Sequence, residues 1–389
     1  MRILIALRQP SLGGGVRSHV ETVASEMQRV GHDVVVFSLD EFAWRDELEA
    51  VGLRTAGSLK GLSGRFDVAI AHDRPSVHDI NAELPELPVA FVWHGNFYDV
   101  DMSPQLDGAV KLIFQPYGPD KTRAAGISVK VPTVQVRQPI ELNKRFTPHG
   151  PIAERPRRAI SLSGYTTDTR RAVLVEACER AGIELELWGA NEELGATRTP
   201  EIAINRADIV FGKGRVVMEA MACGRAAFVY DEFGTDGFVT EENIDELLAS
   251  GIAGTDTPMP ATADRIVEEL ARYDQRMGMV NRDLARHLFR VSAHVATQIS
   301  ALEQLLADNP PAAHNDASFE LARLSRVAWA FEGEAHVMAH RLKQVSVSRE
   351  AWRSEAEELA RELERITTSR RWKLTGMLAR PLDRLRGRG

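Results

Sequence analysis

Short apolar segments alternate with helical segments twice along this chain. Apolar runs of strand length lie first at Arg2–Leu7, Asp33–Ser38, Asp67–Ala71, Val89–Trp93, Lys111–Gln115 and Pro132–Val136. A second set lies at Ala159–Ser163, Glu184–Trp188, Asp208–Phe211 and Ala226–Tyr230. Strands that alternate with helices form parallel sheets with crossover helices. The sequence therefore predicts an α/β fold with two successive Rossmann-like units.

We predict one such domain over residues 1–148 and a second over 149–308. The Pro- and Gly-rich segment Phe146–Arg158 is the expected linker, and the helical stretch from Ala261 to Asp308 is expected to close the second domain. Ligands of such sheets bind beyond the carboxyl ends of the strands. A ligand-binding cleft is therefore expected where the two domains face each other.

Residues 309–368 carry a heptad pattern of mainly apolar positions from Ala317 to Ile366, interrupted at Arg349. Sustained heptads favour a dimeric coiled coil, and one long helix packed back on the body is the alternative. Residues 369–389 interleave Arg and Lys with Trp372, Met377 and several Leu residues. This composition favours an amphipathic segment at an anionic membrane surface, against a solvated end as the alternative.

Charge and cysteine content exclude several classes of protein. The net charge is −7, and the acidic body argues against general nucleic-acid binding, which needs a basic face. The two cysteines lie far apart, so no disulfide framework or cysteine metal site is expected, and a reducing, cytoplasmic location is the expectation. No apolar stretch approaches the length of a membrane-spanning helix.

A glycine-rich loop follows the first strand. Gly13, Gly14 and Gly15 would let backbone amides approach a ligand, and the start of the next helix adds partial positive charge. Arg17 would contact an acceptor or phosphate there, or would be a solvated surface residue. His19 in the same turn is interpreted as structural. Ser18 replaces the third glycine of the dinucleotide fingerprint, which speaks against an NAD(P)-dependent oxidoreductase.

Two histidines follow neighbouring apolar runs. His94 comes directly after the run ending at Trp93, where it could contact a substrate in the cleft. A histidine that caps the loop is an alternative of equal weight. His72 ends the preceding run, and there the structural role is favoured.

The most informative segment runs from Ala207 to Gly224. A strand leads into Gly212, Lys213 and Gly214, and a helix begins near Arg215. Cations and helix-start amides suit a pyrophosphate. Glu219, one turn into that helix, would accept hydrogen bonds from ribose hydroxyls. Its apolar neighbours make an isolated charge there costly without a partner.

These segments resemble the family-4 retaining glycosyltransferases of the GT-B fold, in particular phosphatidylinositol mannosyltransferases, over about residues 1–305. The similar motifs are Gly-Gly-Val-Arg-Ser-His-Val-Glu near the start, the segment from Val136 to Pro148, and Met-Glu-Ala-Met-Ala-Cys-Gly224. The resemblance implies two facing Rossmann-like domains, a nucleotide-sugar donor in the second, an acceptor in the first, and no metal or other cofactor.

The resemblance also implies roles for particular residues. Glu219 matches the family's ribose-binding carboxylate, His94 its histidine beside the transferred sugar, and Arg170 its diphosphate-binding cation. Phe211 stands where the family has a first glutamate, and Tyr165 where it has an arginine. Lys213 and Arg215 are therefore expected to replace the missing phosphate charge.

The expected function is metal-independent, retaining transfer of a sugar to a glycan or lipid-linked acceptor in cell-envelope polysaccharide or glycolipid synthesis. The protein would act in the cytoplasm or at the inner face of the plasma membrane, held there by the basic tail. The alternatives are a non-catalytic binding or scaffold protein, favoured by Phe211, then an NAD(P)-dependent oxidoreductase or a GT-B epimerase.

Overall fold

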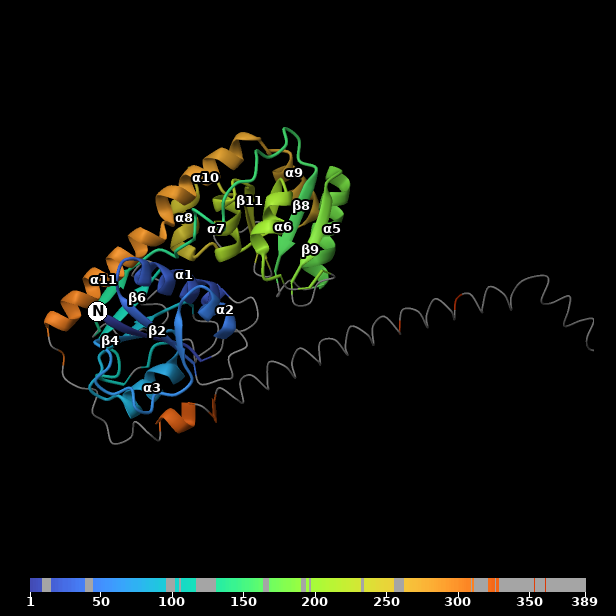
Figure 1. Ribbon diagram of the computed structural model, residues 1–389. Helices are drawn as coiled ribbons and strands as arrows, with labels where there is room; N and C mark the ends of the chain where they lie inside the picture. The colour runs from blue at the N-terminus through green and yellow to red at the C-terminus, as the bar shows by residue number, and fades with distance from the viewer. Residues whose placement is uncertain are drawn as a thin grey trace, which may run out of the picture. The chain divides into compact units, whose positions relative to one another are not determined.

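A computed structural model describes residues 1–8, 15–38, 45–95, 102–104, 106–116, 131–163, 168–189, 194–195, 197–231, 234–254, 262–308, 310, 321–325, 327–328, 353 and 361. The chain separates into two units, Met1–Ser325 and Arg326–Gly389. The strands and helices labelled in Figure 1 belong to the first unit.

The amino-terminal lobe is built on a seven-stranded parallel sheet of order β3-β2-β1-β4-β5-β6-β7. Its strands are β1 (Arg2–Ala6), β2 (Asp33–Phe37), β3 (Arg54–Ala56), β4 (Val68–Ala71), β5 (Val89–Val92), β6 (Leu112–Gln115) and β7 (Thr133–Gln135). Its helices are α1 (Gly15–Arg29), α2 (Arg45–Ala50) and α3 (Arg74–Glu83). The strand order places β1, β4 and β5 side by side at the centre of the sheet.

Apolar periodicity accounts for these elements. Strand β4 is buried along its whole length, as expected for a central strand covered on both faces. Helix α1 buries Val20, Val23 and Met27, which recur at helical spacing along one face. The six strands expected in this part of the chain are confirmed to within two residues at each end. The short strand β3 was not predicted.

The second lobe is built on a five-stranded sheet of order β12-β11-β10-β8-β9, in which only β12 is antiparallel to its neighbour. Its strands are β8 (Arg158–Leu162), β9 (Glu184–Trp188), β10 (Ile209–Gly212), β11 (Ala226–Asp231) and β12 (Gly234–Phe238). Its helices are α5 (Asp168–Ala181), α6 (Pro200–Arg206), α7 (Arg215–Ala222), α8 (Ile244–Ser250), α9 (Ala263–Leu270) and α10 (Arg276–Leu288). The predicted parallel strands are confirmed, whereas β12 was missed.

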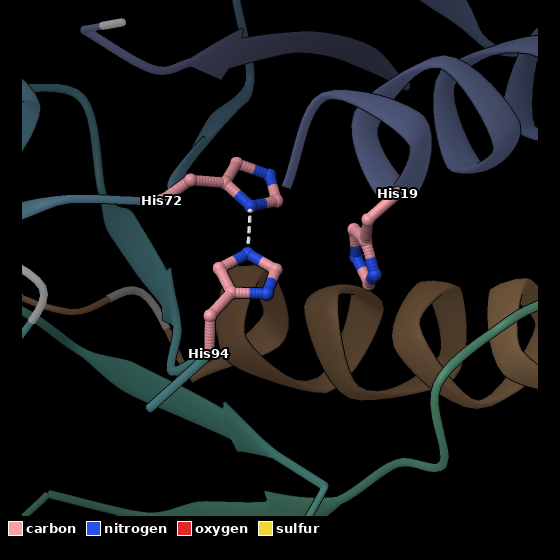
Figure 2. Close-up of side chains that lie close together, drawn as sticks. All are labelled: His19, His72 and His94. Atoms are coloured by element: carbon pink, nitrogen blue, oxygen red, sulfur yellow. Dashed lines mark hydrogen bonds between the residues drawn. The ribbon is translucent and has the colours of Figure 1, made fainter. Parts of the chain in front are cut away.

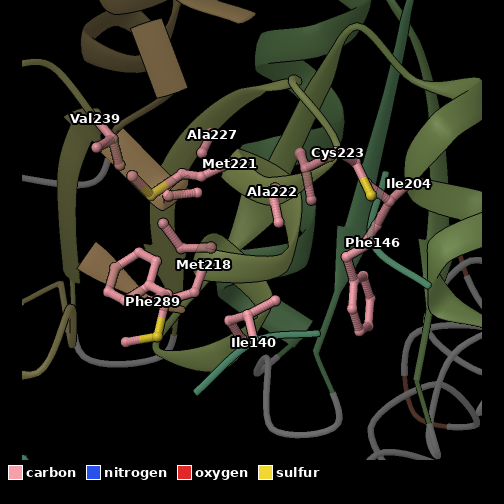
Figure 3. Packing of buried hydrophobic residues seen from close by; sticks show 14 of the residues in the cluster. Ile140, Phe146, Ile204, Met218, Met221, Ala222, Cys223, Ala227, Val239 and Phe289 are labelled. Carbon is pink, nitrogen blue, oxygen red and sulfur yellow. The ribbon is translucent and has the colours of Figure 1, made fainter. Parts of the chain in front are cut away.

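The segment that joins the lobes is packed rather than a free linker. Ile140 and Phe146 belong to the core around α7, and Figure 3 shows Ile140 near Met218 and Phe146 on the side of Ile204. The buried Arg282 of α10 donates hydrogen bonds to the carbonyl oxygens of Leu142, at 2.9 Å, and Phe146, at 3.0 Å. These bonds attach the start of the second lobe to its last helices.

Helix α11 (Val291–Ala307) differs from the prediction, which assigned it to the second domain. Its residues Val295, Leu302 and Leu305 belong to the apolar core of the first sheet, together with Val20 of α1. The chain therefore returns to the amino-terminal lobe after building the second one. Helical periodicity shows that a helix has an apolar face, but it does not show which core that face joins.

Most of the predicted coiled coil and the entire basic tail lie outside the described residues. The described positions of this part, 321–325, 327–328, 353 and 361, are helical. Among the helices that the structure describes, none is both long enough and apolar enough to cross a membrane.

Candidate functional site

The candidate site lies at the carboxyl ends of the central strands of the first sheet. His72 directly follows β4, and His94 lies two residues after the end of β5. Because β4 and β5 are parallel neighbours, their ends meet at one edge. His72 Nδ1 and His94 Nε2 lie 2.7 Å apart, so the two imidazoles share a hydrogen bond (Figure 2).

Two further histidines complete this group. His19, in the first turns of α1, lies with its ring centroid 4.9 Å from that of His94 and 5.5 Å from that of His72. His294 of α11 lies 5.3 Å from His19 between ring centroids. His19 Nδ1 contacts Gln138 Oε1 at 3.0 Å, and His294 Nδ1 contacts the Arg137 carbonyl oxygen at 2.7 Å. We call these four residues the histidine cluster.

Burial keeps the histidine cluster uncharged. It lowers the pKa of His94 to about 3 and that of His294 to about 4, with the Arg215 guanidinium acting in the same direction on both. The pKa values of His19 and His72 also lie well below the ordinary value, mainly because of burial. At neutral pH His94 is therefore a neutral hydrogen-bonding group and a weak general base.

The start of α7 is the second part of the site, and it lies where the sequence predicts it. Gly214 adopts a positive φ of 53°, and its N–H donates to the Ile252 carbonyl oxygen at 2.8 Å. A Cβ on Gly212 would lie 2.5 Å from Val216 Cγ1, so this glycine is required for packing. Two of the glycines proposed to lie under a diphosphate thus have structural roles, and Lys213 between them is half-buried.

Arg215 and Glu219 form a buried ion pair on α7. The distance from Arg215 Nε to Glu219 Oε1 is 2.8 Å, and the side chains are 12% and 6% exposed. Arg215 Nη1 also donates to the Pro139 carbonyl oxygen at 3.0 Å. Burial raises the pKa of Glu219, and the neighbouring Arg215 opposes that shift. The predicted need of Glu219 for a partner is thus met by the arginine one turn away.

The two helix starts approach each other. A Cβ on Gly15, the first residue of α1, would lie 3.8 Å from Arg215 Cδ. Arg215 donates to the Pro139 carbonyl oxygen, while His19 and His294 contact the preceding residues Gln138 and Arg137, so the arginine lies near the histidine cluster. The amino terminus of α1, the amino terminus of α7 and the histidine cluster therefore surround one region, with the Arg137–Pro139 segment beside it.

The remaining predicted residues occupy varied positions. Gly13 and Gly14 lie outside the described residues. Arg17 is buried and ion-paired with Glu47, so the alternative of a solvated surface arginine is wrong. Arg170 lies in the first turn of α5, where its carbonyl oxygen accepts a hydrogen bond from the Tyr230 hydroxyl at 2.6 Å. Because β8 and β10 are parallel neighbours, the helices that follow them, α5 and α7, start at the same sheet edge. Arg170 on α5 and Arg215 on α7 therefore lie at that same edge.

Phe211, at the position of the family's first glutamate, belongs to the core of the second lobe. Its side chain is fully buried, with ring centroids 4.9 Å from Phe228 and 6.3 Å from Tyr230. It is therefore a packing residue, not a group that faces a ligand.

Three members of the histidine cluster were not predicted as site residues. A structural role was expected for His19 and for His72, which shares a hydrogen bond with His94, and His294 was not singled out. A signal for His72 was present, because residues that follow adjacent parallel strands meet at one edge. No local signal marks His294, since α11 reaches the cluster only through tertiary packing.

Comparison with known proteins finds fold relatives only. No model of a known protein family matches the chain, and no curated protein matches it either. A crystal structure of HepE from Anabaena in complex with UDP-glucose matches with a TM-score of 0.56 and 14% identity, covering 78% of this chain and 100% of HepE. A glycosyltransferase from Rickettsia africae matches with a TM-score of 0.54 and 15% identity, covering 78% and 98% of the two chains. The two lobes of this chain therefore have the GT-B fold of these glycosyltransferases.

Proposed function

We propose that the protein is a glycosyltransferase that moves a sugar from a nucleotide-sugar donor to a glycan or lipid-linked acceptor. The observation that carries the proposal is the approach of the two helix starts, with Gly15 of α1 in contact range of Arg215 of α7. The GT-B fold supports it, and fold alone does not fix chemistry. The residues of the site therefore carry the rest of the argument.

The donor is proposed to lie against the second lobe. The amino terminus of α7 attracts anions, and Lys213, Arg215 and Arg170 supply positive charge at the same sheet edge. During transfer the bond between the anomeric carbon and the diphosphate oxygen breaks, and negative charge grows on that oxygen. Protein cations and helix-start amides are proposed to stabilise this charge without a metal ion at the diphosphate.

Glu219 is proposed to bind the ribose. Its Oε1 is held by Arg215, which fixes the orientation of the carboxylate. A carboxylate oriented in this way accepts hydrogen bonds from vicinal hydroxyls. Donor binding would then be coupled to the Arg215–Glu219 ion pair, because the same arginine is proposed to face the diphosphate.

The acceptor is proposed to approach from the first lobe, near Gly15 and His94. Because His94 is neutral, it is proposed to position the sugar by a hydrogen bond. We propose retention of configuration, in which the acceptor oxygen bonds to the anomeric carbon and its proton passes to the leaving diphosphate. No nucleophilic residue is assigned. A role in cell-envelope synthesis at the cytoplasmic face of the membrane is part of the proposal and rests on the basic tail.

The test begins with donor binding. Full-length protein would be heated with UDP-, GDP- and dTDP-sugars, beginning with UDP-glucose because HepE has been crystallised with it. The donor that raises the unfolding temperature would then be assayed for slow hydrolysis. Lys213→Ala and Arg215→Lys should each lower kcat/KM roughly 10- to 100-fold, the effect of losing or misplacing a charge-assisted hydrogen bond.

Arg206→Ala is the matched control, because Arg206 is an exposed arginine on α6 in the same lobe. It should keep the wild-type kcat/KM. If folded Lys213 and Arg215 variants also keep it, the diphosphate assignment is wrong. Binding of a nucleotide sugar without any hydrolysis or transfer would favour the second candidate, a non-catalytic GT-B binding protein. Phe211 supports that candidate, because phenylalanine provides no carboxylate at this position.

A further inference from the structure

Three histidines of the cluster have the geometry of a metal site. His19, His72 and His94 each offer one imidazole nitrogen, and these three nitrogens lie within 4.8 Å of one another. They come from α1 and from the segments after β4 and β5, and Figure 2 shows the rings turned toward a common region. Neutral imidazole nitrogens are common ligands of zinc and other divalent transition metals.

The hydrogen bond of His19 fixes which of its nitrogens is available. Gln138 Oε1 can only accept a hydrogen bond, so the proton of His19 lies on Nδ1, 3.0 Å from that oxygen. Nε2 consequently carries a lone pair. It is buried and has no hydrogen-bond partner in the described part of the chain, on a residue only 2% exposed. An unsatisfied acceptor in that position is unfavourable, and a bound cation would satisfy it.

The bond between His72 and His94 is compatible with metal binding. One proton lies between His72 Nδ1 and His94 Nε2, which are 2.7 Å apart. If the donor histidine took the tautomer with this proton on its other ring nitrogen, both rings would stay neutral and both facing nitrogens would carry a lone pair. Two imidazole nitrogens on a tetrahedral zinc ion lie about 3.3 Å apart, as follows from bonds of about 2.0–2.1 Å. The pair would have to widen by about 0.6 Å, a change within the reach of small side-chain rotations.

The surroundings of the three histidines are also those expected around metal-bound histidines. Metal-bound histidines usually donate their second ring N–H to a carbonyl or carboxylate, as His19 does to Gln138. No carboxylate is among the three ligands, so the bound ion would keep its full charge. Arg215 adds to that charge and is itself paired with Glu219. An anion or hydroxide would therefore be the preferred fourth ligand.

We propose that His19, His72 and His94 bind one divalent transition-metal ion of the zinc type, with a fourth position open to a small anionic ligand. The site shares no residue with the diphosphate site proposed above, but it does include His94, which is proposed to position the sugar. A bound ion would fix the start of α1 to the ends of β4 and β5. The proposal goes beyond the glycosyltransferase function and does not depend on it.

The test uses untagged full-length protein, stripped with a chelator and then titrated with Zn²⁺ against a chromophoric competitor. We expect one high-affinity equivalent. Co²⁺ in place of Zn²⁺ should give the intense visible bands of a four-coordinate ion. His19→Gln and His72→Gln should each weaken Zn²⁺ binding at least about 100-fold, since loss of an outer-shell partner alone costs 10–100-fold. Gln138→Ala should weaken it about 10–100-fold, because the His19 tautomer is no longer fixed.

His287→Gln is the matched control, because His287 is exposed on α10. It should bind Zn²⁺ as the wild type does. Circular dichroism would show that each variant is folded. If a variant does not fold, the Co²⁺ spectrum of the wild type decides the question. Stoichiometric binding that His19→Gln and His72→Gln leave unchanged, or the absence of four-coordinate Co²⁺ bands, would show that the histidines form only a hydrogen-bonded cluster. Neither result bears on nucleotide-sugar binding.

Discussion

At the scale of single residues, the sequence shows which side chains are charged. It predicts their ion-pair partners only where both residues lie on one helix. The spacing of Arg215 and Glu219 is that of side chains one turn apart, and the two form an ion pair at 2.8 Å. The bond from Arg215 to the Pro139 carbonyl oxygen spans 76 residues and has no sequence signal. The same holds for His94 and His294, which meet in one cluster from distant parts of the chain.

A pH dependence follows from His78 on α3. This side chain is 6% exposed, and burial, assisted by Arg74, lowers its pKa from 6.5 to about 4. Below pH 6.5 the unfolded chain binds a proton at His78 that the folded chain excludes. The contribution of the neutral His78 to the free energy of unfolding is therefore fully present above pH 6.5 and is lost as the pH falls toward 4. Between these values His78 should lower the free energy of unfolding by about 1.4 kcal/mol per pH unit.

Urea unfolding at pH 7.5, 6.5 and 5.5 would measure this dependence. Between pH 6.5 and 5.5, His78→Gln should have a smaller pH slope of the free energy of unfolding than the wild type, by about that amount. Equal slopes for wild type and His78→Gln would contradict the prediction.

At the scale of elements, strands with strong local signals were predicted and weak ones were not. Strand β4 is four consecutive buried apolar residues, which is a clear pattern. Strand β3 has only three residues, and β12 (Gly-Thr-Asp-Gly-Phe) has two glycines and an aspartate, so neither resembles a strand in sequence. A Cβ on Gly234 of β12 would lie 2.2 Å from the Gly254 carbonyl oxygen, which explains the glycine by tertiary contact.

Helix α11 provides an element-scale prediction. Leu302 is fully buried in the core of the first lobe, although the helix follows the second lobe in sequence. Leu302→Ala should destabilise the protein by about 2–5 kcal/mol, because it removes buried methyl groups and leaves a cavity. Ser300→Ala, at an exposed position of the same helix, should change stability by less than about 0.5 kcal/mol. Urea unfolding of both variants would test this, and a Leu302→Ala protein as stable as the control would contradict the assigned packing.

At the scale of the whole molecule, the likeness to GT-B glycosyltransferases is one of fold at low identity. The match to HepE covers 78% of this chain and 100% of HepE, with 14% sequence identity. A sheet with alternating helices tolerates wide sequence change as long as the apolar pattern is kept. The fold can therefore be recognised even at this low sequence identity.

The basic tail gives a prediction at this scale, made from sequence because these residues lie outside the described part. Full-length protein should sediment with vesicles that contain anionic phosphatidylglycerol, and a chain ending at Ile366 should not. Each Lys or Arg near such a surface contributes about 1 kcal/mol. Binding should weaken with added salt and with neutral phosphatidylcholine vesicles. Equal sedimentation of the two chains would remove the membrane role.

Local sequence patterns predict the two α/β lobes, their parallel strands and the helix that begins at Arg215, because apolar periodicity and glycine position act over a few neighbouring residues. Only tertiary packing shows that α11 joins the first lobe, that Phe211 is a core residue, and that His19 and His294 lie against His72 and His94. These features depend on contacts between residues far apart in the chain. Such contacts form only when the sheets and helices pack together, and no local pattern encodes them.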